Sequence, residues 1–550
     1  MPSFSSLKQI IYRQFTKGHG LSLKTDALRY LEEALLMQGV PEGSWNDAVE
    51  FLVEAYVKKE DVDSSVLVTK EALENLVETL RNNLAATSLG TDYRDTCMED
   101  SPVDAAELFW VINAFDMPRW NYLSDLKTFE PETQPATIFA APTEKGDMYR
   151  ARFNLLKQRT LRNEHFSAPA FVSNDRNAYF KITPIKSLLG RENEQFLLFG
   201  MLTELQDGKF FLEDEDANIE LDLSSCRHGS GFFVDNCFIL AEGTYTEDNI
   251  FKVDELGLPP AEKRSVTDST LGTLDFLGLP KILYSESILL QEEKLNEDIA
   301  IITISDVWLD QPKILKALRK IFEGYSESLV PLAFILIGNF ISTPYPYSGA
   351  QSQKYKECFS QVADLIAEFP NLANFSHFVF VPGSNDPWGS NVLPRPPIPN
   401  VFTTKIRQKV KRAHFTSNPC RIKYCTQEIV IFREDILSKL RRNCLLPPNI
   451  EGEDDDLTKH LIRTVLDEAH LCPLTLSVRP IYWAYDHALR LYPMPRVLVL
   501  ADQCENYGIN YQDCHCINPG SFPNSDFTFS LYYPATGKSE KCVLPTDTLW

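Results

Sequence analysis

Several short apolar runs in the second half of the chain end on a carboxylate or an amide. The run "AIITISD" ends at Asp306, "LAFILIGN" ends at Asn339, and the loop "PGSND" that follows "HFVFV" ends at Asp386. Side chains that follow the strands of an α/β sheet gather at one edge, where such folds place their sites. A metal ion held there by carboxylates would activate water for hydrolysis. The pattern therefore has the outline of a metal-dependent hydrolase site.

The ligands that such a site requires are scarce at these positions. After Asp306 the next candidates are Val307 and Trp308, and neither side chain can bind a metal ion. Asn339 offers only a neutral carbonyl oxygen, which is a weak ligand for a hard cation. Three further polar stretches follow predicted strands or lie in the loops between them: Asp502, residues 416–421 and residues 518–522. None of them contains a histidine. We therefore predict no catalytic residues, no metal ligands and no cofactor, and we leave open a single stray ion near Asp306 and Asp386.

Other chemistries find no support in the motifs. The chain contains neither G-x-S-x-G nor the phosphate-binding pattern G-x-x-x-x-G-K-[ST]. Cys504, Cys514 and Cys516, with His515 between the last two, come nearest to a zinc site. A C-x-C spacing chelates a tetrahedral ion poorly, because structural zinc sites usually use C-x2-C or a similar knuckle. We therefore expect free thiols, as in a reducing compartment.

Strands alternate with helices from residue 282 onward. The runs named above and "RVLVLAD" are continuous and apolar, which is typical of strands buried on both faces of an α/β sheet. Helical patterns at "PKILKALRKIF" and "KYKECFSQVADLIAEF" lie between the first three runs, so right-handed crossovers are expected. Residues 282–550 are therefore predicted to form one α/β domain.

Residues 171–262 show a period of two. Five short segments alternate apolar and polar side chains, with turns such as Asp207 and Gly208 between them, and they predict a small closed barrel of the OB type. From Arg191 to Leu258 there are four Lys or Arg residues against sixteen Asp or Glu. A groove that binds single-stranded nucleic acid is basic, whereas this segment is acidic. We therefore expect the barrel to be a structural or protein-binding module. A single-strand binder, with affinity that falls steeply with salt, is a further alternative.

The chain before the barrel is predicted to be mainly helical. Residues 1–84 are predicted to form a small α-helical bundle, in which Trp45, Val49 and Val53 belong to one apolar stripe. Residues 85–170 are predicted to be a linker with connecting helices. Within this segment, "MYRARFNLLKQRTLRNEHF" is a basic amphipathic helix that should dock on a neighbouring domain.

Composition limits the kinds of partner. The chain has 550 residues and a net charge of −22, so as a whole it should repel phosphate backbones. We find no apolar run long enough for a membrane span and no signal peptide, and we expect a protein inside the cell. Residues 401–425 are a local exception, with seven Lys or Arg and no acidic residue. This segment is either a salt-bridged face or a seat for DNA at Lys409, Lys411 and Arg412.

Several rare strings resemble a known family. They are "SDVWLD", "IGNF", "PGSNDP", "NPCRIKYCTQEIVIFRED" and "CINPGSF". Their order is similar to that of the calcineurin-like phosphoesterases, and the strings themselves resemble the accessory B subunits of replicative DNA polymerases, above all the epsilon branch. Against the metal motifs of the phosphoesterases, Trp308 takes the place of the first histidine and Asn339 that of the bridging aspartate. The motifs at residues 383–386 and 518–521 likewise supply no histidine.

This resemblance implies a multidomain protein. It would have an N-terminal helical domain (1–84) similar to the lid of AAA+ ATPases, an OB-fold barrel (171–262) and an inactive phosphoesterase-like α/β domain (282–550). The implied role is that of a non-catalytic scaffold subunit of the DNA polymerase epsilon complex in the nucleus, not of an enzyme.

The resemblance also implies partners. The barrel and the inactive domain would hold the zinc-containing C-terminal region of the catalytic subunit. The helical domain would contact the GINS part of the replicative helicase, and small histone-fold subunits would associate through the holoenzyme. Contact with DNA would be weak or indirect, and no membrane would be involved. The alternative function is a phosphoesterase that uses Asp306, Asn339 and Asp386 with an unusual metal.

Overall fold

The computed structural model describes most of the chain after residue 107. The described ranges are 108–167, 179–206, 208–272, 274–279, 286–345, 348–387, 391–448 and 456–545. The chain divides into two compact units, Met1–Ser101 and Pro102–Trp550, and each is considered by itself.

The first unit is described only at scattered positions: residues 11, 15, 22–24, 27–31, 49, 53, 67–68 and 73. The short strands β1 (Ser22–Leu23) and β2 (Leu67–Val68) pair in parallel, and Val49 and Val53 of the predicted apolar stripe are buried. Most of the predicted helical domain at 1–84, and the predicted linker up to residue 107, lie outside the described residues.

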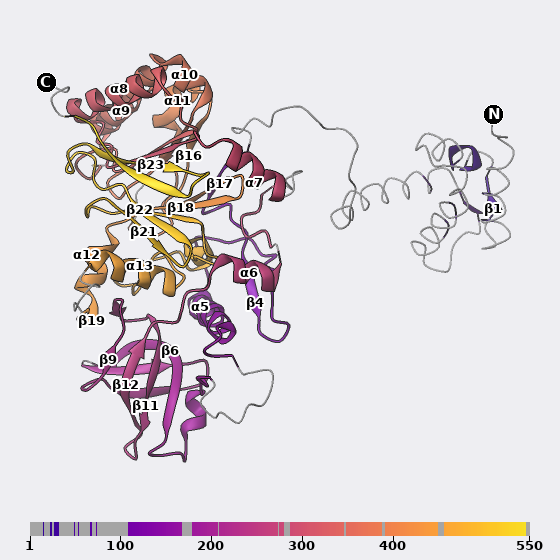
Figure 1. Cartoon of the computed structure of the whole chain (residues 1–550), viewed down its shortest axis with the longest axis vertical. Coiled ribbons are helices and arrows are strands. Elements are labelled where there is room, and N and C mark those ends of the chain that lie inside the picture. The colour runs from indigo at the N-terminus through magenta and orange to yellow at the C-terminus, as the bar shows by residue number, and fades with distance from the viewer. Residues whose placement is uncertain are drawn as a thin grey trace. The chain divides into compact units, whose positions relative to one another are not determined.

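Five strands close into the predicted OB-type barrel, at the lower end of the molecule in Figure 1. Strand β6 pairs with β11 and β7, β8 joins β7 to β12, and β12 returns to β11. The strands are β6 (Gln195–Gln206), β7 (Lys209–Glu213), β8 (Asn218–Asp222), β11 (Phe238–Tyr245) and β12 (Ile250–Gly257). The period of two thus identified every strand of the closed barrel, but not the short strands β9 (Arg227–His228) and β10 (Phe233–Val234) beside it.

Two glycines allow the barrel strands to approach closely. A Cβ atom on Gly243 would lie 2.1 Å from the carbonyl oxygen of Lys252, and one on Gly200 would lie 2.5 Å from that of Glu213. The register of β11 against β12 shifts at Gly243, as in a β-bulge. Glycine at these positions permits the tight bending that closes a small barrel.

The α/β domain contains two six-stranded mixed sheets instead of the single sheet that the alternation of strands and helices predicted. The first has the order β16-β15-β14-β13-β23-β24, and the second has the order β21-β22-β20-β18-β17-β3. The first sheet consists of β13 (Ile301–Ser305), β14 (Ala333–Ile337), β15 (His377–Val381), β16 (Ala413–Phe415), β23 (Thr528–Tyr533) and β24 (Lys538–Val543). The second consists of β3 (Phe109–Asn113), β17 (Cys420–Tyr424), β18 (Gln427–Arg433), β20 (Val497–Ala501), β21 (Tyr507–Tyr511) and β22 (Cys514–Asn518).

The two sheets pack face to face over a shared apolar core. Ile335 and Val379 of the first sheet belong to the same buried cluster as Ile422, Ile431 and Val499 of the second. Helices cover the outer face of the first sheet, and the barrel with further helices covers that of the second (Figure 1). The covering helices are α8 (Pro312–Glu327), α9 (Gly349–Ala367), α10 (Pro370–Phe375) and α11 (Asn400–Lys409) on one side, and α12 (Ile436–Arg442) and α13 (Leu457–Asp467) on the other. Since both faces of both sheets are buried, the apolar runs are continuous.

Two segments lie elsewhere than the sequence placed them. Strand β20, from "RVLVLAD", pairs with β18 and β22 in the second sheet and not with the strands that precede it. Strand β3 lies within the segment that the sequence assigned to a linker, and it pairs with β17, more than 300 residues away along the chain. The reason is tertiary: Phe109 and Ile112 are buried against the second sheet, and nothing near them in sequence signals that partner.

Helix α5 (Thr143–Arg162) docks between the barrel and the α/β domain, which confirms the amphipathic helix predicted there. Phe153 and Leu156 pack with Phe199 of the barrel. The basic side of this helix is also buried, which the sequence did not predict: Arg152 donates from Nε to Asp486 at 2.9 Å. Among the described residues of this unit, the remaining helices are η3 (Ile185–Leu188), α6 (Arg264–Leu271), α7 (Glu286–Leu295) and η5 (Trp483–Leu489).

The end of α13 joins the α/β domain to the barrel through hydrogen bonds. The backbone N–H of Phe238 donates to both carboxylate oxygens of Glu468, at 3.0 and 3.1 Å. The N–H of Phe232 donates to Thr464 Oγ1 at 2.7 Å. Burial raises the pKa of Glu468 to about 8, against the opposing effects of the Phe238 hydrogen bond and of Arg159.

Within the described ranges, no helix is both long and apolar enough to cross a membrane.

The pKa of Glu468 predicts a pH dependence of stability. The unfolded carboxyl ionises near pH 4.5 and the folded one near pH 8. Between these values the folded state keeps a proton that the unfolded state loses, so the free energy of unfolding falls as pH rises. Glu468→Gln removes this dependence but keeps an oxygen for the Phe238 N–H. In urea unfolding at pH 5 to 8, the variant should gain roughly 1 kcal/mol over the wild type for each pH unit.

The matched control for this experiment is Glu297→Gln, which alters an exposed glutamate. Its difference from the wild type should not change with pH. A Glu468→Gln difference that is equally flat from pH 5 to 8 would show that this carboxyl ionises normally in the folded protein.

Candidate functional site

The carboxyl ends of the strands bring Asp306, Asn339 and Asp386 together, as the sequence predicted. Asp306 directly follows β13, is only 1% exposed and has a left-handed φ of 57°. Its Oδ1 accepts a hydrogen bond from the backbone N–H of Asn339 at 3.2 Å. Asn339 Oδ1 in turn accepts from the backbone N–H of Asn385 at 2.8 Å, in the loop that carries Asp386. A strained residue at a strand end is frequent in functional sites, where it directs a side chain into the mouth of the sheet.

A buried arginine lies at the centre of this cluster. Arg433 ends β18 and is 3% exposed, and its Nη2 donates to Asp306 Oδ1 at 2.9 Å. Its Nε donates to Gly338 O at 3.0 Å, and its Nη1 donates to Asp435 Oδ1 at 2.7 Å and to Ala501 O at 3.2 Å. One guanidinium therefore links the ends of β13 and β14 in the first sheet to those of β18 and β20 in the second. Burial acts to lower the pKa of Arg433, but Asp306 and Asp435 outweigh it and the pKa is raised.

The hydrogen-bond acceptors of Asp386 are occupied by the protein. One carboxylate oxygen accepts from the N–H of Phe340 at 2.9 Å and from Tyr355 Oη at 3.0 Å, and the other accepts from the N–H of Gly383 at 2.7 Å. Burial raises the pKa of Asp386 to about 6, although these hydrogen bonds act to lower it. The packing is close, since a Cβ on Gly338 would lie 2.2 Å from Asp386 Oδ2.

Amide side chains hold the neighbouring loops. Asn418 donates to Pro382 O at 3.0 Å and to Arg433 O at 2.8 Å. Asn518 accepts from the N–H of Asp502 at 3.2 Å and donates to Cys504 O at 3.1 Å. These amides stand near the strand ends where a metallohydrolase would carry ligands, but here they serve as connectors between loops.

The residues present do not fit a pair of divalent cations. Among the described residues, no group of three or more His, Cys, Asp or Glu side chains could hold a metal ion. Trp308 packs against the apolar core of the first sheet. The positive charge that balances Asp306 comes from Arg433, and a second cation beside it would be repelled. The arrangement is an ion-pair network in which Arg433 occupies the place beside Asp306.

The cysteine cluster and the basic segment also have structural roles. The cysteines in the described ranges form no disulfide, and His515 bonds to Asn510 and Ser539. In the basic segment, Lys405 and Lys409 both pair with Asp364, at 2.6 and 2.5 Å. These pairs favour the salt-bridged alternative for this part of the segment. A DNA contact at Lys409, Lys411 and Arg412 remains a prediction.

Sequence reasoning missed the role of Arg433. The signal was present, because the apolar run "IVIF" (429–432) ends directly on Arg433, as "AIITIS" ends on Asp306. An arginine placed at the same sheet edge as an unpaired carboxylate could have been read as its partner. The pairing was not visible because the two residues are 127 positions apart and lie in different sheets.

These features define a class of protein: an OB-type barrel attached to an α/β domain of two facing sheets, in which a buried arginine joins the strand ends. Two family models match the chain. Residues 301–508 match the model of the B subunit of DNA polymerase alpha/epsilon, and residues 142–260 match the OB-fold domain described as DNA polymerase epsilon subunit 2-like.

Curated relatives cover nearly the whole chain. The chain is 40% identical to DNA polymerase epsilon subunit 2 of Bos taurus, over 94% of this chain and 95% of that protein. It is 39% identical to the Homo sapiens protein of the same name, over 96% and 97%, and 33% identical to that of Drosophila melanogaster, over 96% of each chain. The chain therefore belongs to the family of DNA polymerase epsilon subunit 2.

Among solved structures, a novel archaeal phosphodiesterase matches 45% of this chain and 100% of its own, with 12% identity and a TM-score of 0.25. A similarity of this size carries no conclusion about function.

The ion pair at the centre of the cluster predicts a non-additive effect on stability. Arg433→Met leaves the Asp306 carboxylate buried without a cation, and it should lower the free energy of unfolding by about 3–5 kcal/mol. The double variant Arg433→Met/Asp306→Asn removes both charges, so it should be more stable than the single Arg433→Met variant. Urea unfolding of the wild type, both single variants and the double variant measures the coupling.

The control is Arg441→Met, on the exposed side of α12, which should change stability by no more than about 0.5 kcal/mol. Strictly additive losses in the double variant would mean that Arg433 and Asp306 do not depend on each other.

Proposed function

We propose that this chain is a non-catalytic accessory subunit of DNA polymerase epsilon. It would act as a scaffold that binds the C-terminal region of the catalytic subunit and links the polymerase to the replicative helicase. Family membership over nearly the full length supports the accessory role. The absence of catalysis is supported chiefly by one observation, the buried guanidinium of Arg433 on Asp306.

The scaffold role agrees with how the unit is constructed. The barrel, α5 and the α/β domain are joined by buried contacts, including the ion pair of Arg152 with Asp486 and the bonds of Glu468 to Phe238. A barrel and a sheet domain fixed to each other offer a continuous surface to a partner, at no ordering cost on binding. The acidic barrel favours protein over nucleic acid as that partner.

The finer assignments follow the family resemblance. The zinc-containing C-terminal region of the catalytic subunit would bind the barrel and the α/β domain. The helical domain at 1–84 would contact GINS, and the histone-fold subunits would associate through the holoenzyme. The protein would act in the nucleus, with weak or indirect contact to DNA. Of these proposals, the association with the catalytic subunit is tested by the purification described below.

An activity assay separates the scaffold from a phosphoesterase. The full-length protein with manganese should not hydrolyse bis(p-nitrophenyl) phosphate above the rate of the buffer, because the donor set does not fit a metal pair. Asp306→Ala should behave as the wild type does. Turnover that is abolished by Asp306→Ala and unaffected by Asp298→Ala, which alters an exposed carboxylate, would establish the phosphoesterase instead.

Purification of the native full-length protein tests the partnership. Mass spectrometry of the eluate should find the DNA polymerase epsilon catalytic subunit in stoichiometric amount, since permanent subunits bury large interfaces. Removal of the C-terminal region from the catalytic subunit should abolish this association. Recovery of the chain alone, or unchanged binding of the truncated catalytic subunit, would contradict the scaffold proposal.

A further inference from the structure

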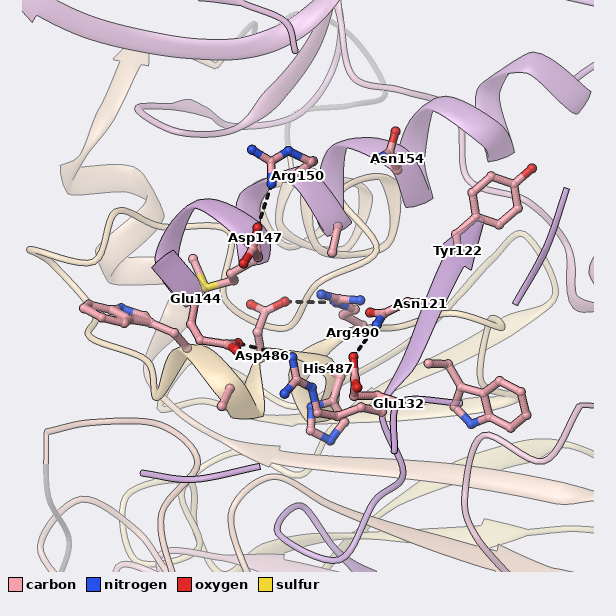
Figure 2. Close-up of a pocket in the computed structure, with 16 residues that line it drawn as sticks. Asn121, Tyr122, Glu132, Glu144, Asp147, Arg150, Asn154, Asp486, His487 and Arg490 are labelled. Atoms are coloured by element: carbon pink, nitrogen blue, oxygen red, sulfur yellow. Dashed lines mark hydrogen bonds and ion pairs between the residues drawn. The ribbon is translucent and has the colours of Figure 1, made fainter. Parts of the chain in front are cut away.

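A polar cavity lies apart from the strand-end cluster, on another side of the second sheet. It has a volume of about 350 Å³ and lies between α5, strand β4 (Trp120–Leu123) and η5 (Figure 2). None of its lining residues belongs to the cluster around Arg433. The volume falls within the range of sites that accept small molecules or the side chains of a partner.

The floor of this cavity carries an arginine with spare hydrogen-bonding capacity. Arg490 Nε donates to Asp486 Oδ2 at 2.9 Å, and Figure 2 shows its guanidinium near the centre of the cavity. Among the described residues, none bonds to its terminal amino groups. The other oxygen of Asp486 already accepts from Arg152 and lies 3.2 Å from His470 Nε2. One buried carboxylate thus serves two guanidinium groups, which leaves Arg490 only partly compensated.

A second group in the wall also lacks a partner. His487 Nε2 lies 3.0 Å from Met117 O, and since a carbonyl only accepts, Nε2 carries the hydrogen. The buried Nδ1 is then an acceptor, and it has no partner among the described residues. Burial, together with Arg490, lowers the pKa of His487 to about 4, so the ring is neutral at physiological pH. Within the same described part of the chain, the buried Nε1 of Trp120, a donor, is likewise unpartnered.

The carboxylates at the rim are already engaged. Glu144 pairs with Arg119 at 3.2 Å, Asp147 pairs with Arg150 at 2.6 Å, and Glu132 accepts from the amide of Asn121 at 2.8 Å. Figure 2 shows the bonds of Asp147 to Arg150 and of Glu132 to Asn121. Arg119 and Arg150 each have a carboxylate of their own, whereas Arg490 shares Asp486 with Arg152. Arg490 is therefore the arginine of this cavity that is least compensated, and a carboxylate is the group that best completes a guanidinium.

Apolar and aromatic side chains surround the polar floor. Trp120, Trp483 and Tyr122 line the cavity, and together with its arginines they have the composition of interface hot spots. The neighbouring loop between β5 (Thr128–Pro131) and α5 holds Phe139 88% exposed and Ile138 48% exposed. Exposed large apolar side chains beside a partly empty pocket are typical of a surface that binds protein.

We propose that this cavity and the loop at Ile138 and Phe139 form a docking site for a short segment of a partner protein that carries one carboxylate among apolar residues. An aspartate or glutamate side chain of the segment would accept hydrogen bonds from the terminal amino groups of Arg490. Apolar neighbours in the segment would cover Phe139 and Trp483. The proposal rests on the proposed accessory function in one respect: the partner is taken to be another subunit of the DNA polymerase epsilon complex.

The charge of the surroundings favours a peptide over nucleic acid. The chain carries a net charge of −22, and the adjacent barrel has sixteen acidic residues against four basic ones. A phosphate backbone would bring several charges against this field, whereas a segment with a single carboxylate needs only Arg490.

Photo-cross-linking in the assembled complex tests the site. The photoreactive residue p-benzoylphenylalanine is placed at position 139, and cross-linking is carried out on complexes that already contain the catalytic subunit. It should cross-link to a segment of a partner protein that has an Asp or Glu within a few residues of the cross-linked position. The matched control carries the same group in place of Phe375, which is 61% exposed in α10 on the far side of the α/β domain. This control should not capture that segment.

A synthetic peptide of the captured segment then tests the chemistry. Replacement of the acidic residue of this peptide by the corresponding amide should weaken its binding to the full-length protein about tenfold or more. The Arg490→Gln variant of the protein should bind the unchanged peptide more weakly by a similar factor. Because Arg490 also supports Asp486, Phe139→Ser provides a second variant that alters only an exposed side chain, and it too should weaken binding.

Three results would overturn the proposal: no partner cross-link at position 139 in the intact complex, a captured segment without an acidic residue, or a cross-link to nucleic acid. Because the cross-links are scored on complexes that have already assembled, such a failure counts against the docking site and not against the accessory function.

Discussion

The guanidinium of Arg433 is the constraint on which the mouth of the α/β domain depends. Arg433 ends β18 of the second sheet, and it donates to groups at the ends of three further strands: β13 and β14 of the first sheet and β20 of the second. It also neutralises the buried Asp306. A buried ion pair adds little net stability compared with apolar packing, but loss of either partner is costly. The loops around it, held by Asn418 and Asn518, are arranged around a fixed side chain, so the site is a rigid junction between the sheets.

Buried charge also joins the larger parts of this unit. Arg152 of α5 reaches Asp486, and Glu468 at the end of α13 accepts from the first residue of barrel strand β11. Such polar contacts have strict geometry, whereas apolar contacts between the barrel and the second sheet would tolerate sliding. The combination explains how an acidic barrel can be fixed to the sheet domain at a defined orientation, which a scaffold requires.

Local pattern predicted the elements better than their partners. Continuous apolar runs identified β13, β14, β15 and β20, and the period of two identified the barrel strands, because burial on one or both faces is visible in the residues themselves. The second sheet was not predicted. Whether β20 pairs with β18 or with β15 depends on contacts between side chains that are far apart in the sequence. For the same reason Asp306, Asn339 and Asp386 could be placed together at a strand edge, while Arg433 and the floor of the cavity at Arg490 could not.

The position of β3 has a mechanical consequence. Strand β3 lies near the start of the second compact unit, Pro102–Trp550, and it pairs with β17 along all five of its residues. Its hydrogen bonds therefore share any load that is applied along the strand. The first described element of this unit is thus fixed to a sheet whose other strands come from residues 420–518.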